Sequence, residues 1–330
     1  MPHNALMPSE ETSTTLSGGT GLGSLGSFED WRQGHAVDRC CLKKVVCGAG
    51  LASYSGDAER EFASIRRWLQ ASAGFDSTDF LEATYAGSTI GVEWRPRPYH
   101  VRDAQAPIEA SALAMARELE WYRERLPATR FYLLGYSLGG VIAFEAAGQL
   151  LSHDLAGWRG RLAGVATLSS PLLGVDFGVL SEWARTLATR PDFYGQAGLE
   201  LVERARDPDT LGRQESLAAL LRAGGVHLLT VVDENDAVVL PRDAILPSAR
   251  AAGEVVAIRA RLPADADEVA RRFGHGPVLA DPDCLAAVAR LVGEQECLGP
   301  HRRLSEAERV EAELAAMREE LRRRRPGGAG

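Results

Sequence analysis

Short apolar runs alternate along the chain with stretches whose apolar positions recur at helical spacing. The apolar runs predict strands at Leu42–Cys47, Phe80–Tyr85, Arg130–Leu134, Ala163–Leu168, His227–Val232 and Val255–Arg259. The helix-period stretches predict helices at Ala58–Ala71, Ile108–Arg125, Gly139–Leu151 and Pro282–Val292. Such alternation is typical of a mostly parallel sheet with helices on both faces. We therefore expect an α/β fold.

Residues 176–225 interrupt this alternation, because they are longer than one crossover helix requires. They contain apolar helical runs at Leu180–Leu187, Leu199–Arg204 and Leu217–Leu221. We interpret 176–225 as a helical cap insertion over a site, within one catalytic domain that covers residues 42–300.

The two ends of the chain lack the alternation of strands and helices that predicts this domain. Residues 1–41 are predicted to be a flexible tail, because Ser, Thr and Gly dominate Ser9–Ser27 and leave little apolar surface to offset the entropy of ordering. Residues 301–330 are predicted to form a charged helix and tail, since apolar residues recur at helical spacing among Glu and Arg at Val310, Leu314, Met317 and Leu321. That helix would dock on the domain or on a second copy of the chain, which makes a homo-oligomer a possibility.

Composition excludes several classes of protein. The chain has 37 Lys+Arg against 45 Asp+Glu, a net charge of −8, so we expect no nucleic-acid partner. No stretch approaches the roughly 18 to 20 apolar residues of a membrane span, so we expect no transmembrane segment. The five cysteines lack disulfide or zinc-site spacing, and the N-terminus lacks a secretory signal pattern. These features favour a cytoplasmic protein without a metal.

The segment Gly135–Gly140 carries the first sign of chemistry. It reads Gly-Tyr-Ser-Leu-Gly-Gly and lies between a predicted strand and a predicted helix. A G-x-S-x-G pattern in this context places the serine on a tight, strained turn, where side chains at the glycine positions would clash with neighbouring backbone. Ser137 is therefore the candidate nucleophile.

A serine hydroxyl needs a base to take its proton and an acid to orient that base. When the order along the chain is serine, acid, histidine, the acid follows a later strand and the histidine a still later one. Asp233 and Asp236 both follow the strand at His227–Val232; we favour Asp236 as the acid, with Asp233 as the alternative. His275, between two glycines, is favoured over His301, which lies beyond the last predicted helix of the domain.

An oxyanion hole needs backbone N–H donors close to the serine. Leu138, directly after Ser137, is the first candidate. The second should come from the glycine-containing loop after the first strand, where we favour Ala49, with Gly50 and Leu51 as alternatives.

Two glycine motifs suggest a nicotinamide cofactor instead. Gly21–Gly26 matches G-x-G-x-x-G, but no predicted strand precedes it and no helix follows. Gly48–Ser53 does follow a strand, yet Ser53 stands where the third glycine or alanine belongs, and Glu82 lies inside a strand and too far along for the ribose-binding acid. We expect no cofactor.

Taken together, these motifs resemble the α/β-hydrolase superfamily and in particular its lipase-like serine esterases. The resemblance runs from about Leu42 to Val292 and rests on the segments Val46–Gly50, Gly135–Gly140, Ser169–Gly174, Asp236–Val239 and Gly274–Gly276. In those relatives a His-Gly pair often opens the oxyanion loop. Cys47 replaces that histidine here, so how the loop is hydrogen-bonded stays open.

The resemblance implies a hydrolase that cleaves a carboxylic ester through an acyl-enzyme formed on Ser137, with His275 as base and Asp236 orienting it. It implies a small acyl ester or lipid-like substrate and no cofactor. A thioesterase or an acyltransferase could use the same three residues. A binding protein of the same fold without turnover is the alternative from another class.

Overall fold

The computed structural model describes residues 42–90, 93–175, 191–262 and 273–293. Four features considered from the sequence lie outside these residues: the N-terminal tail, the C-terminal helix, the Gly21–Gly26 motif and His301.

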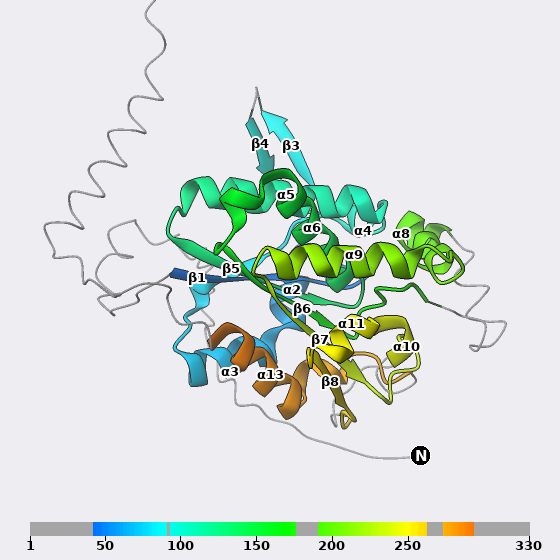
Figure 1. Cartoon of the computed structure of the whole chain (residues 1–330). Coiled ribbons are helices and arrows are strands. Elements are labelled where there is room, and N and C mark those ends of the chain that lie inside the picture. Colours follow the sequence, from blue (N-terminus) through cyan, green and yellow to red (C-terminus); the bar gives the residue numbers. More distant parts are fainter. Residues whose placement is uncertain (1–41, 91–92, 176–190, 263–272, 294–330) are drawn as a thin grey trace, which may run out of the picture. The chain divides into compact units, whose positions relative to one another are not determined.

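A six-stranded sheet forms the centre of the described domain (Figure 1). Every neighbouring pair of strands in it is parallel. Its strands lie in the order β2 (Phe80–Glu82), β1 (Leu42–Gly48), β5 (Thr129–Tyr136), β6 (Leu162–Leu168), β7 (His227–Asp233) and β8 (Val255–Ile258). Each of these strands overlaps one apolar run of the sequence, so the predicted α/β fold is confirmed.

Helices cover both faces of the sheet (Figure 1). One layer contains α5 (Ile108–Arg125), α6 (Leu138–Trp158) and α9 (Thr210–Ala223), and the other contains α3 (Ala63–Ala73) and α13 (Pro282–Gly293). Side chains alternate across a strand, so Val46 packs in the first layer while its neighbours Val45 and Cys47 pack in the second. This burial on both faces explains why the strands read as continuous apolar runs.

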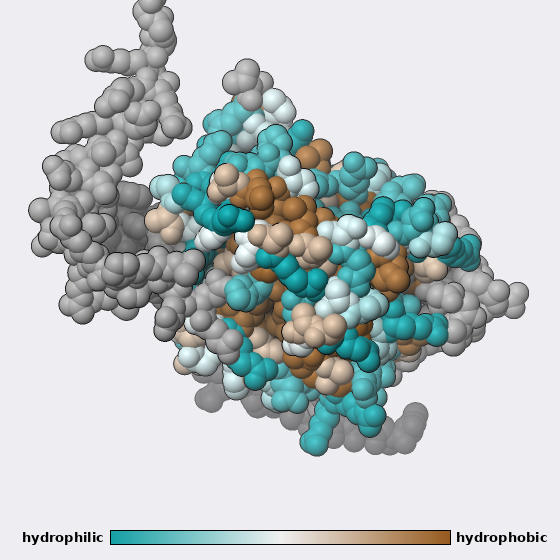
Figure 2. All heavy atoms as spheres, in the orientation of Figure 1, coloured by the Kyte–Doolittle hydropathy of each residue, from teal (hydrophilic) through white to brown (hydrophobic). Residues whose placement is uncertain are grey.

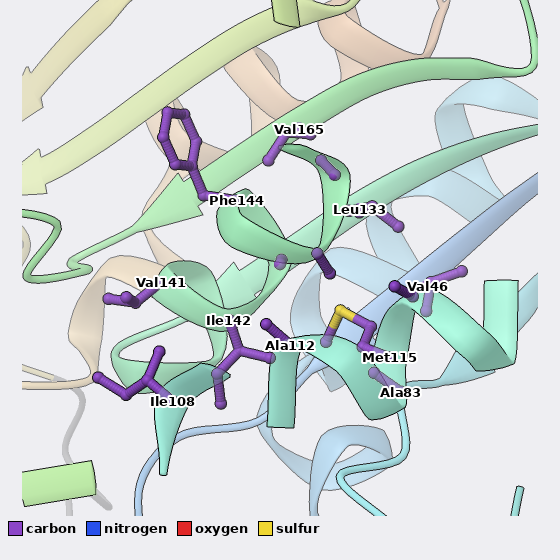
Figure 3. Close-up of a cluster of buried hydrophobic side chains, with 14 of the residues drawn as sticks. Val46, Ala83, Ile108, Ala112, Met115, Leu133, Val141, Ile142, Phe144 and Val165 are labelled. Atoms are coloured by element: carbon purple, nitrogen blue, oxygen red, sulfur yellow. The ribbon is translucent and has the colours of Figure 1, made fainter. Parts of the chain in front are cut away.

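The core between the sheet and the α5–α6 layer is closely packed (Figure 3). Val46, Leu133 and Val165 extend from three neighbouring strands toward Met115 of α5 and Ile142 of α6. These side chains are at most 1% exposed. The start of α6, and with it Ser137, is thereby fixed against the sheet.

Shorter elements connect these layers. They are the helices α2 (Asp57–Glu61), α4 (Val101–Ala104), α8 (Pro191–Arg204), α10 (Pro241–Ala244) and α11 (Pro247–Ala251), the 3₁₀ turns Ser77–Asp79 and Pro277–Ala280, and an antiparallel hairpin of β3 (Gly87–Ile90) and β4 (Glu93–Pro96).

Two predicted segments differ from the structure. The helix predicted at Ala58–Ala71 is divided into α2 and α3 at Phe62, a fully buried residue with φ −88° and ψ 12°. The cap predicted at 176–225 is too long at its C-terminal end, because α9 packs against α6 and β7 as an ordinary crossover helix, with Ala218 and Leu221 in the core. Residues 176–190 lie outside the described part, so a cap stays a prediction for the segment before α9.

The described helices include none that is long and apolar enough to span a membrane. Nor do the described residues bring together three or more His, Cys, Asp or Glu side chains as a metal site. On the face seen in Figure 2, hydrophobic residues of the described part lie in separate patches among hydrophilic ones.

Candidate active site

The three residues proposed for catalysis come together at the carboxyl edge of the sheet. Ser137 follows β5, Asp236 follows β7, and His275 lies in the segment between β8 and α13. His275 Nε2 lies 3.0 Å from Ser137 Oγ, and His275 Nδ1 lies 2.7 Å from Asp236 Oδ2. Because the strands are parallel, their carboxyl ends meet at one edge, where ligands of open α/β sheets bind. The three side chains form one continuous hydrogen-bonded chain.

Ser137 occupies a strained turn between β5 and α6. Its φ of 54° and ψ of −126° lie outside the regions that serine normally adopts. The Ser137 N–H donates to the Leu168 carbonyl at 3.0 Å, and the Ser137 carbonyl accepts from the Gly140 N–H at 3.1 Å. These bonds and the packed start of α6 hold the strained backbone, which directs the hydroxyl away from the sheet.

The glycines around Ser137 permit close backbone contacts. A Cβ atom at Gly135 would lie 2.3 Å from Gly140 Cα. A Cβ atom at Gly139 would lie 2.2 Å from the Gly48 carbonyl oxygen, in the loop after β1. Both distances are shorter than any real contact, so glycine is required at these positions and the serine turn stays in contact with the β1 loop.

The His275 ring is fixed by its neighbours. It stacks on the Tyr136 ring, with centroids 4.9 Å apart and planes inclined by 29°. Gly274, with φ 68°, passes so close to Asn235 that a Cβ atom would lie 2.3 Å from the Asn235 carbonyl oxygen. The histidine side chain is 10% exposed. The ring therefore keeps one edge toward Asp236 and the other toward Ser137.

The two candidate acids have different partners. Asp236 Oδ1 accepts the N–H groups of Val238 at 2.8 Å and Val239 at 3.0 Å, which leaves Oδ2 for His275. Asp233 Oδ1 instead accepts the N–H groups of Asn235 at 2.9 Å and Ala260 at 3.2 Å, and burial raises the pKa of this carboxyl. Asp236 thus contacts the histidine, while Asp233 binds the backbone of its own loop and of the chain after β8.

The loop after β1 lies beside the serine. A Cβ atom at Gly50 would lie 3.5 Å from Ser137 Cβ. The Gly50 N–H donates to Glu61 Oε2 at 3.2 Å, and the Ala49 carbonyl accepts the Tyr85 hydroxyl. No hydrogen bond within the described residues uses the Ala49 N–H.

Leu138 is the first residue of α6, so its N–H has no acceptor within the helix. Of the three loop donors considered from the sequence, Gly50 already donates its N–H to Glu61, while no hydrogen bond among the described residues uses the N–H of Ala49 or Leu51. Ala49 and Leu138 stay the predicted donors to the oxyanion, with Leu51 as the alternative in the loop.

Glu61 and Tyr85 are site residues that the sequence pattern does not reveal. The one signal is Cys47, which replaces the usual histidine and indicates that the loop must be bonded by other groups. Cys47 itself is buried, and burial raises the pKa of its thiol to about 12, so it is not a nucleophile at neutral pH.

The alternative of a dinucleotide site in Gly48–Ser53 finds no support in the geometry. Glu82 is the acid that was considered for binding a ribose. Its carboxylate instead accepts the N–H groups of Gly56 at 2.7 Å and Ala58 at 3.4 Å. It therefore supports the start of α2. The Ser53 hydroxyl pairs with the Tyr99 hydroxyl at 3.2 Å, and both are buried.

A family comparison agrees with this fold. The sequence model of a family described as "alpha/beta hydrolase fold" matches residues 73–222. No curated protein matches the chain.

The solved structures that are similar include phospholipase PlaB of Legionella pneumophila, with 13% identity, a TM-score of 0.39, and coverage of 58% of this chain but 38% of that one. This chain thus spans less than half the length of that phospholipase. A lipase of Bacillus licheniformis in its mature form has 14% identity, coverage of 68% and 88%, and a TM-score of 0.43. A thioesterase of the prodiginine pathway of Streptomyces coelicolor has 18% identity, coverage of 76% and 91%, and a TM-score of 0.36.

The family match includes β5 and the serine turn, and the sheet order and the positions of the helices extend the same architecture to β8. This chain is an α/β-hydrolase-fold protein.

Proposed function

We propose that this protein is a serine hydrolase that cleaves a carboxylic ester through an acyl-enzyme intermediate. The observation that carries the proposal is the hydrogen-bonded chain from Ser137 through His275 to Asp236. A nucleophile, a base and an orienting acid in this order form the arrangement that serine hydrolases of unrelated folds share.

In the first half of the reaction, Ser137 Oγ attacks the ester carbonyl carbon while its proton passes to His275 Nε2. Asp236 keeps the other ring proton on Nδ1 and stabilises the imidazolium. The carbonyl oxygen becomes negative and accepts the N–H groups of Leu138 and Ala49. When the tetrahedral intermediate collapses, the C–O bond to the alcohol breaks and the alcohol leaves with the proton from Nε2.

In the second half, His275 takes a proton from a water molecule, which attacks the acyl group on Ser137. The second tetrahedral intermediate collapses, the carboxylic acid leaves, and Ser137 Oγ regains its proton from Nε2. Both halves use the same two N–H groups. A small acyl ester or lipid-like molecule is the substrate class that we propose.

A panel of acyl esters of increasing chain length, run beside acyl thioesters and acyl amides, tests this function. We expect saturable hydrolysis of esters by the wild type and its loss in Ser137→Ala. Hydrolysis confined to thioesters would overturn the ester assignment and leave the three catalytic residues in place. Equal ester hydrolysis by Ser137→Ala would overturn the whole proposal.

A further inference from the structure

A carboxyl group beside the oxyanion loop has no task in the mechanism above. Glu61 is the last residue of α2, and its Oε2 atom accepts the Gly50 N–H at 3.2 Å. Gly50 in turn lies against Ser137. The carboxyl therefore acts on the loop one residue away from the Ala49 donor.

Glu61 and Tyr85 hold the two ends of one peptide group. The Tyr85 hydroxyl donates to the Ala49 carbonyl, and the N–H of the same peptide, which belongs to Gly50, donates to Glu61. Because a peptide group is planar, fixing its carbonyl and its N–H fixes the orientation of the whole unit. Tyr85 is a rigid partner, since it is 4% exposed and its ring lies 4.8 Å from that of Tyr99.

The contact of Gly139 with the loop limits movement from the other side. A Cβ atom at Gly139 would lie 2.4 Å from the Ala49 carbonyl oxygen, so this carbonyl is pressed against the start of α6. A rotation of the Ala49–Gly50 peptide group would therefore break its hydrogen bonds with both Tyr85 and Glu61.

We propose that Glu61 is a positioning residue of the oxyanion hole: by accepting the Gly50 N–H, it holds the loop so that the Ala49 N–H faces the oxygen that becomes negative. This inference rests on the proposed function. It also answers how a loop with Cys47 in place of histidine is hydrogen-bonded.

The environment of the Glu61 carboxyl disfavours its charged form, which supports a role in function rather than in stability. Burial raises its pKa to about 7, against the lowering effect of the hydrogen bond from the Gly50 N–H; Asp57 adds to the increase, and Arg60 and His275 oppose it. A group whose charged form is disfavoured by its surroundings is not one that stabilises the fold by being ionised.

Three substitutions separate the effect of the hydrogen bond from that of the fold. Glu61→Leu removes the acceptor, Glu61→Gln keeps an acceptor oxygen without the charge, and Tyr85→Phe removes only the hydroxyl at the other end of the peptide. Glu59→Leu is the matched control, because Glu59 lies on the same helix with a side chain that is 75% exposed and paired with Arg66.

The measurements are kcat and KM on the best ester, the rate of inactivation by a fluorophosphonate, and the thermal unfolding midpoint at pH 8. We expect Glu61→Leu and Tyr85→Phe to lower kcat and the inactivation rate by about 10- to 100-fold, less than the loss of an oxyanion donor itself. KM should change by less than about threefold. Glu61→Gln and Glu59→Leu should resemble the wild type, and Glu61→Leu should unfold at no lower temperature than the wild type.

Wild-type kcat in Glu61→Leu would overturn the inference. So would a loss in Glu61→Gln as large as that in Glu61→Leu, because the acceptor oxygen would then not be what matters. If Glu61→Leu does not fold, a structural role is indicated, and wild-type kcat in Tyr85→Phe would then overturn the proposal. Failure of the proposed function is a separate result: Ser137→Ala would be as active as the wild type.

Discussion

The carboxyl edge and the amino edge of the same sheet are built differently. At the carboxyl edge, Ser137, His275 and Asp236 form one hydrogen-bonded chain. At the amino edge lies a cavity of about 930 Å³, whose lining includes Arg130, Arg159, Arg222 and Arg290. There Arg222 forms two hydrogen bonds with Glu254, at 2.9 and 2.6 Å.

The carboxylates at the two edges are satisfied in different ways. At the amino edge Glu254 is paired with an arginine, which is a stabilising arrangement of surface charges. At the carboxyl edge Asp236, Asp233 and Glu61 accept backbone N–H groups, and burial raises the pKa values of Asp233 and Glu61. Carboxyls that are shielded from water close to a nucleophile are typical of a site where stability is sacrificed for chemistry. The comparison indicates that the convergent side chains at the carboxyl edge locate the chemistry.

The largest effect that we expect is the loss of the base. His275→Ala should lower kcat for the best ester by on the order of 10⁶, because the three residues act as a unit. His153→Ala, at an exposed position on α6, is the control and should be unchanged. Steady-state kinetics check this, and a loss of less than about a hundredfold in His275→Ala would contradict the assignment.

The two aspartates after β7 provide a matched pair. Asp236→Asn should lower kcat by on the order of 10⁴, because an amide at this position cannot hold the imidazole in the required tautomer. Asp233→Asn should cost little activity, since Asp233 binds backbone N–H groups away from the histidine. Equal losses in both variants, measured under the same conditions, would remove the distinction between the two acids.

Glu118 tests the stability cost of a buried carboxyl behind the carboxyl edge. It is 2% exposed, accepts the Thr84 N–H at 2.8 Å, and has its pKa raised by burial from 4.5 to about 8. The folded state therefore holds a proton that the unfolded state has lost between these two values, so stability falls as the pH rises through this range.

Glu118→Gln should abolish this fall. Relative to the wild type, its free energy of unfolding should increase between about pH 4.5 and pH 8 by a few kcal/mol and stay level above. Urea unfolding of both proteins across this pH range measures the difference. A difference that does not change with pH would show that this carboxyl keeps an ordinary pKa.

The smallest effect belongs to the amino edge. Arg290→Ala should change kcat and KM for ester hydrolysis by less than about twofold, because the cavity that Arg290 lines lies at the opposite ends of the strands from Ser137. A large loss of kcat in Arg290→Ala would show that the two edges of the sheet are coupled, and would contradict this expectation.

Much of the fold follows directly from the sequence. Strands buried on both faces appear as apolar runs, so the strands of the sheet were all predictable, and α5 and α13 begin where their patterns do. The β3–β4 hairpin was not predictable, because both strands are short and lie outside the main sheet, and Gly87–Ile90 is largely exposed while Glu93–Pro96 is mostly half-buried. The predicted cap wrongly included α9, because the length of a segment alone cannot distinguish a crossover helix from an insertion.

The site shows the same limit. Ser137, His275 and Asp236 could be proposed because the chemistry requires their residue types in a known order on successive loops. Glu61 could not, because its importance arises from the division of α2 and α3 at Phe62 and from one backbone contact with Gly50. Neither the division of the helix nor the contact with Gly50 produces a recurring pattern of apolar residues in the sequence. Residues that act through the backbone of a neighbouring loop become visible only when that loop is folded.

The most direct test of the central claim is to identify the residue that a fluorophosphonate modifies in the whole protein. We predict a single adduct on the peptide that contains Ser137, and no adduct in Ser137→Ala at the same reagent concentration. His275→Ala should be modified far more slowly than the wild type, since the hydroxyl would lack its base. An absence of modification in the wild type, or an adduct that persists in Ser137→Ala, would contradict the account.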